Sequence, residues 1–109
     1  MNASAQLAVS PGRVGAMVAG SVATAVGVRA GLGPLASDRA GRMLLDAIAG
    51  SGLPVSLGLE ATDGSLRVMV TPGPELLPAL RASFGRDRVA ERDGAAEIVI
   101  ERPGLRLAE

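Results

Sequence analysis

The sequence predicts a two-layer α/β sandwich, in which a mainly antiparallel sheet carries helices on one face. Three observations lead to this fold class: a central β-hairpin with alternating apolar residues, helical apolar spacing on both sides of it, and a final apolar strand. Each element must bury its apolar face against another layer, so helices between antiparallel strands favour a sandwich. With 109 residues, the chain suits one small domain.

The central hairpin covers residues 55–70. Apolar residues alternate along both strands, at Val55, Leu57 and Leu59 and then at Leu66, Val68 and Val70. Alternation at every second residue is typical of a strand with one buried face. Between the strands, Asp63 and Gly64 supply the positive φ angles that a tight turn requires. This segment therefore predicts two adjacent antiparallel strands.

Two amphipathic helices are predicted before the hairpin. In the first, residues 11–30, Ser10 is the expected cap and Pro11 the first helical residue. Its apolar stripe comprises Val14, Met17, Val18, Val22, Ala25 and Val26. The second helix lies within residues 37–52, with Ser37 or Asp38 as its cap. Its stripe comprises Ala40, Met43, Leu44, Ala47 and Ile48, and Arg42 has the spacing for an ion pair with Asp46.

The remaining elements complete a β-α-α-β-β-α-β order. Residues 5–9 can form a short edge strand, and the apolar spacing from Glu75 to Phe84 predicts a third helix. Proline and glycine make residues 71–74 a rigid loop. The other predicted segments are a charged connection at 86–92 with a brief strand around Val89, a last strand at 95–102, and a loose tail at 105–109. The predicted domain covers residues 1–104.

The composition excludes several kinds of chemistry. The chain has no Cys and no His, so it lacks disulfides, thiolate nucleophiles and the commonest metal ligand and general base. Arginine accounts for all 11 basic residues and is balanced by 11 acidic ones, and the single aromatic residue offers little for stacking on bases. Nucleic acid is therefore not an expected partner. The abundance of Ala, Arg and Gly without Lys suggests a bacterium with a GC-rich genome.

The uncharged segment at residues 14–28 is too short and too rich in small residues to span a membrane. The preceding residues lack the basic start of a signal peptide. We therefore expect that the protein has no membrane segment and is not exported. Its expected location is the cytoplasm.

Three segments in this order carry a resemblance to a known family. They are the helix DRAGRMLLDAIAGSG, the hairpin VSLGLEATDGSLRVMVTPGP and the glycine-led strand GAAEIVIER. Together with the leading strand and long first helix, they resemble a small GHKL (Bergerat-fold) ATP-binding domain, and in particular the bacterial anti-sigma factor serine kinases. The resemblance covers nearly the whole chain and implies a Bergerat-like version of the sandwich.

The residues of the family's chemistry are mostly replaced. In the family, a Glu on the second helix is the general base and an Asn four residues later holds Mg²⁺; here these positions are Asp46 and Gly50. The family's Asp-x-Gly-x-Gly loop reads adenine through its Asp. Here Thr71 replaces that Asp, Gly73 keeps the first glycine, and Glu75 replaces the second. Glu75 would add bulk and negative charge beside phosphates.

The resemblance with these replacements implies a catalytically inactive regulatory module that binds proteins, with no cofactor, metal or catalytic residue. Its expected partners are a sigma factor, an anti-sigma antagonist, a related kinase or a second copy in a homodimer. Two alternatives stay open. One is an active ATP-binding serine kinase or ATPase that uses Asp46 as its base. The other is a small structural subunit that assembles with copies of itself.

Two groups of residues are candidates for contacts with a partner. Arginine is frequent at binding hot spots, which makes Arg81, Arg86, Arg88 and Arg92 a possible partner-binding patch. Neighbouring acidic residues balance this charge, so a solvated mixed-charge surface is the alternative. The first helix also carries a row of small residues, at Gly15, Ala16, Ala19, Gly20 and Ala23. These allow close packing, either against the protein's own sheet or against a partner.

Overall fold

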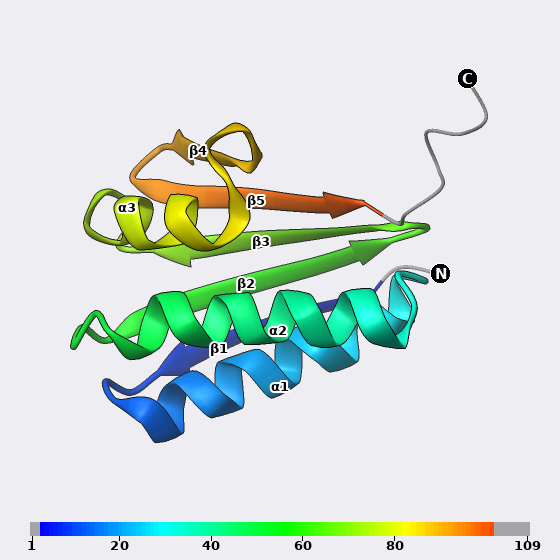
Figure 1. The fold of residues 1–109 in the computed structure, drawn as a ribbon, viewed down its shortest axis with the longest axis horizontal. Helices are drawn as coiled ribbons and strands as arrows, with labels where there is room; N and C mark the ends of the chain where they lie inside the picture. The colour runs from blue at the N-terminus through cyan, green and yellow to red at the C-terminus, as the bar shows by residue number, and fades with distance from the viewer. Residues whose placement is uncertain (1–2, 102–109) are drawn as a thin grey trace.

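The computed structural model describes residues 3–101, which form a five-stranded antiparallel sheet with three α-helices on one face (Figure 1). The strand order is β1-β2-β3-β5-β4. The strands are β1 (Ala3–Val9), β2 (Val55–Thr62), β3 (Ser65–Thr71), β4 (Val89–Arg92) and β5 (Ala95–Glu101). The helices are α1 (Arg13–Arg29), α2 (Pro34–Ala49), α3 (Gly73–Phe84) and the short 3-10 helix η1 (Arg86–Arg88). The predicted two-layer sandwich is confirmed, whereas the tail predicted at 105–109 lies outside the described residues.

Both strands of the predicted hairpin are confirmed, but of the two turn residues only Gly64 adopts the predicted positive φ, and Asp63 does not. Strands β2 and β3 pair antiparallel, and Gly64 in the turn has a φ of 78°. All six of the alternating apolar residues of the hairpin are buried. The turn also contacts the helical layer, because the Gly64 amide donates a hydrogen bond to the Ala30 carbonyl oxygen at 2.6 Å. The brief strand predicted around Val89 is present as β4.

All three helices begin at other residues than predicted. Helix α1 begins at Arg13 after Gly12, so the capping role predicted for Ser10 is wrong. Helix α2 begins at Pro34, which corrects the caps predicted at Ser37 and Asp38. The physical reason for the early start of α2 is that proline is well suited to the first helical position, where its missing N–H costs nothing.

The third helix also starts early. It begins at Gly73, so the rigid loop predicted at residues 71–74 is reduced to Pro72 between β3 and α3. Pro74 lies in the first turn of α3, where a backbone N–H would have no intrahelical acceptor, so its missing N–H costs no helical hydrogen bond; Pro78 lies farther inside the helix.

Helix α1 faces the core with its small residues. Ala16, Ala19, Gly20 and Ala23 are buried. A Cβ atom on Gly20 would lie 2.8 Å from the Gly41 carbonyl oxygen of α2, so the two helices touch backbone to backbone. The four small residues therefore pack within the protein's own fold, but Gly20 lies against α2 and not against the sheet as predicted.

Most of the apolar stripe predicted for α1 faces solvent, whereas the apolar stripe of an ordinary amphipathic helix faces the core. Val14, Met17, Val18 and Ala25 are exposed, and only Val26 of the predicted stripe is fully buried. The close approach of α2 explains this, because larger side chains do not fit on the side of α1 where backbones meet.

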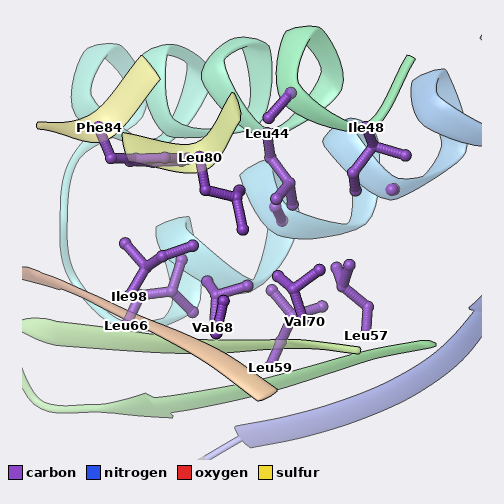
Figure 2. Close-up of a cluster of buried hydrophobic side chains, with 14 of the residues drawn as sticks. Leu44, Ile48, Leu57, Leu59, Leu66, Val68, Val70, Leu80, Phe84 and Ile98 are labelled. Carbon is purple, nitrogen blue, oxygen red and sulfur yellow. The ribbon is translucent and has the colours of Figure 1, made fainter. Parts of the chain in front are cut away.

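Large apolar side chains fill the space between the helices and the sheet (Figure 2). Leu44 and Ile48 of α2 and Leu80 and Phe84 of α3 extend toward the sheet. Opposite them lie side chains from β2, β3 and β5, including Leu57, Leu59, Leu66, Val68, Val70 and Ile98. The predicted α2 stripe is thereby confirmed, with Met43 partly buried at its margin.

Candidate functional site

The five positions that the resemblance relates to the nucleotide chemistry of the anti-sigma factor kinases lie at one end of the fold. Asp46 and Gly50 lie at the C-terminal end of α2, and Thr71, Gly73 and Glu75 lie where β3 continues into α3. Both segments are found at the same end of the sheet in Figure 1. The chain order of the elements thus brings these positions into one region.

Within this region, the side chains do not converge. Thr71 is exposed and lines a hollow on the sheet face opposite the helices, whereas Asp46 is exposed on α2, in the helical layer. Glu75 is exposed in the first turn of α3, where a negative charge is favourable beside the helix N-terminus. Arg42 pairs with Asp38 at 3.1 Å, which corrects the pair predicted with Asp46.

Gly73 is required by packing within the fold. Its amide donates a hydrogen bond to the Gly94 carbonyl oxygen at 2.9 Å. A Cβ atom at this position would lie 2.6 Å from the Ala96 nitrogen and 2.7 Å from the Ala95 Cα. The space that a side chain would need is therefore occupied by the backbone of β5.

The sheet face opposite the helices, which we call the open face, contains three hollows of about 440, 530 and 510 Å³. The surface is hollowed at its centre because Gly58 has no side chain and the neighbouring residues on β1 are mostly small or polar. The first hollow is lined by residues of β1, β2 and β3, including Gln6, Ala8, Ser56, Gly58, Met69 and Thr71.

A row of alternating charges crosses the open face over four strands. Arg67 on β3 contacts Glu60 on β2 at 3.6 Å and Glu97 on β5 at 3.3 Å. Arg92 on the edge strand β4 contacts the same Glu97 at 3.5 Å. We call these four residues the charge row. The Glu97 side chain is only 10% exposed, so its two arginine partners compensate for much of the cost of burying its carboxylate.

The charge row was missed by sequence reasoning. Glu60 and Arg67 lie at exposed positions that alternate with the buried residues of the hairpin, whereas Glu97 is buried between two buried residues of β5. The alternation was visible in the sequence, but the pairing of β3 with β5 was not. Only that register, with Met69 opposite Glu97, brings Arg67 near Glu97.

The four arginines predicted as a partner-binding patch are all exposed, but they belong to different surfaces. Arg88 and Arg92 line hollows of the open face. Arg81 lies on α3 in the helical layer, and Arg86 lies in η1. Arg92 is already paired with Glu97. Two of the four therefore lie on the open face, each beside a different hollow, and this face carries mixed charge.

Among residues 3–101, no helix is long and apolar enough to cross a membrane, and no cluster of three or more acidic side chains could hold a metal ion. The chain matches no protein-family model, and no curated protein matches its sequence.

Proposed function

We propose that this protein is a regulatory protein-binding module of the cytoplasm that acts without hydrolysing ATP. The observation that carries the proposal is the packing of Gly73. In the resembling kinases the glycines of this loop let the backbone approach a nucleotide, whereas here the glycine is needed for the approach of β5. The exposed and diverging positions of Asp46 and Thr71 support the same conclusion.

The open face is the proposed docking surface for the partner. Its hollows are lined by small, polar and oppositely charged side chains, which suit a polar protein surface better than an apolar ligand. By the resemblance, the partner class is a sigma factor, an anti-sigma antagonist or a related kinase. The charge row presents two glutamates and two arginines, so we expect the partner to match it with both signs of charge.

The first prediction is that Mg-ATP leaves the melting temperature unchanged. A ligand at a hundred times its Kd stabilises the native state by about 2.7 kcal/mol. For a domain of this size, each kcal/mol raises the melting temperature by about 4–8 °C. Thermal melting with and without Mg-ATP and Mg-ADP measures this directly. A clear rise would contradict the proposal and favour an active ATPase or kinase, for which Asp46→Ala would then be the test of the base.

The second prediction concerns the open face. We expect the tagged protein to capture a sigma factor, an anti-sigma antagonist or a related kinase from its native host, and Gly58→Arg to abolish that capture. A Cβ at Gly58 meets only the Met69 Cβ at 3.8 Å, so the large side chain is tolerated by the fold and projects over the hollows. Ala82→Arg, at an exposed position on α3, is the matched control and should retain the partner. Equal capture by both variants would exclude the open face as the docking surface.

A further inference from the structure

The outer face of α1 is apolar although it is exposed. Val14 is 77% exposed, Met17 is 51% exposed, and Val18 and Val28 are each 50% exposed. The charged residues of the helix are confined to its two ends, at Arg13 and Arg29. Single exposed apolar residues are normal on a protein surface, but a continuous row of them marks an interaction surface.

The spacing of this row is that of a helix that packs against another helix. Val14, Val18, Ser21, Ala25 and Val28 follow one another at steps of four, three, four and three residues, and all five are exposed. We call these five residues the outer seam. Alternating steps of three and four residues keep side chains on the line of contact between two packed helices. No element within residues 3–101 covers the seam, so it is accessible to a helix of a second molecule.

The outer seam has a nearly symmetric order of residues about Ser21, so two copies of it can pair in opposite directions. If two copies of α1 pack antiparallel with Ser21 at the centre, Val14 meets Val28 of the second copy and Val18 meets Ala25. Each contact of a large residue is then repeated symmetrically, as a two-fold interface requires. From these observations we infer that the protein forms a symmetric homodimer through antiparallel packing of α1 against α1 along the outer seam.

The charges of α1 are compatible with this arrangement. Arg13 and Arg29 are 16 positions apart, which places them about 160° apart around the helix axis at 3.6 residues per turn. They therefore lie on opposite flanks of the seam, and antiparallel packing does not bring them together. Antiparallel helices also place opposite ends of their dipoles side by side.

The size of the seam indicates how strong the dimer is. A helix of 17 residues is about 25 Å long and roughly 10 Å wide, a footprint well below the ~800 Å² per partner of a standard interface. We therefore expect a reversible dimer that forms at high protein concentration and dissociates on dilution. The open face lies on the opposite side of the sheet and stays available to the partner of the proposed function.

Sedimentation velocity over a wide range of concentrations tests the dimer. We expect a reversible monomer–dimer equilibrium, and Val18→Glu should raise the dimer dissociation constant at least about tenfold, because each dimer would bury two unpaired carboxylates. Val99→Glu is the matched control, at an exposed valine of the open face, and should leave the equilibrium unchanged. A monomer at every concentration, open assemblies larger than a dimer, or a dimer sensitive only to Val99→Glu would overturn the inference.

Disulfide trapping tests the relative orientation of the two α1 helices. Because the chain has no natural cysteine, an introduced cysteine can form a disulfide only with another introduced cysteine. Ser21→Cys should oxidise to a covalent dimer, because the two-fold axis passes beside this position. Val14→Cys alone and Val28→Cys alone should stay monomeric, whereas a mixture of the two should cross-link, since a disulfide needs Cα atoms within about 7 Å. Efficient cross-linking of Val14→Cys with itself would show parallel packing and contradict the antiparallel seam. Circular dichroism of each variant verifies that the fold is retained.

Discussion

Gly73→Ala is expected to lower the free energy of unfolding by about 3 kcal/mol, because the added methyl group would overlap backbone atoms that cannot rotate away. Its Cβ would lie 2.6 Å from the Ala96 nitrogen and 2.7 Å from the Ala95 Cα. To relieve this overlap, the start of α3 must move away from β5, which weakens the hydrogen bond from the Gly73 amide to Gly94. Urea unfolding followed by circular dichroism measures the loss.

Gly50→Ala is the matched control for this prediction. Gly50 is another of the positions that the resemblance relates to a nucleotide site, but it has a φ of −84°, and a Cβ added there would meet no other atom within 4 Å. Alanine should therefore be neutral or stabilise the protein by less than about 1 kcal/mol, through a less flexible unfolded chain. If Gly73→Ala proved as harmless as Gly50→Ala, the close packing of β5 on Gly73 would be wrong, and the proposed function would lose its main support.

Leu80→Ala is expected to cost about 3 kcal/mol. Leu80 is fully buried and fills the space between α3 and the sheet (Figure 2). Truncation of a buried leucine loses transfer free energy and leaves a cavity that its neighbours fill only in part, with a total cost of about 2–5 kcal/mol. In a chain whose core contains a single aromatic side chain, this is a large share of the total stability.

Leu35→Ala is the control for core truncation, since Leu35 is 87% exposed in the first turn of α2. We expect a change within about 0.5 kcal/mol, as for surface positions in general. Chemical denaturation of both variants beside the wild type measures the contrast. Similar losses at Leu80 and Leu35 would contradict the arrangement of the core.

The sheet could be predicted because its signals are local. Alternation in Val55–Thr62 and Ser65–Thr71, with Asp63 and Gly64 between them, specifies both strands, their pairing and the buried face. The helix starts were less predictable because two kinds of start signal compete. Ser10 and Ser37 have suitable side chains, but Gly12 and Gly33 adopt positive φ angles and begin the helices instead.

The orientation of α1 could not be predicted from hydropathy. An ordinary amphipathic helix buries its largest apolar residues. In this protein, the distance between α1 and α2 is set by Gly20 and Gly41, and only small side chains fit there. Steric volume, and not apolar character, therefore decides which face of α1 is buried. That information lies in the pairing of two helices and is absent from the pattern of either one.

The sequence could identify the positions of the candidate site but not the directions in which their side chains face or how tightly they are packed. The resemblance supplied the two sets of positions, from Asp46 to Gly50 and from Thr71 to Glu75, and the structure then placed them at one end of the fold. The resemblance could not show that Thr71 faces the open side of the sheet while Gly73 is closed in by β5. Both facts depend on strand pairings between segments that are distant in the sequence.

The position of β1 has a consequence for how the molecule reaches its fold. The β2–β3 turn joins residues that are neighbours in the chain, whereas β1 pairs with β2 from Val9↔Val55 to Ala3↔Ala61. Closing such a long loop costs entropy that only later contacts repay. Strand β1 precedes the other strands in the sequence but is therefore expected to be among the last to join the sheet, after α1 and α2 have packed and the hairpin has formed. Until then β2 has a free edge, and the growing chain would be most vulnerable to mispairing at that strand.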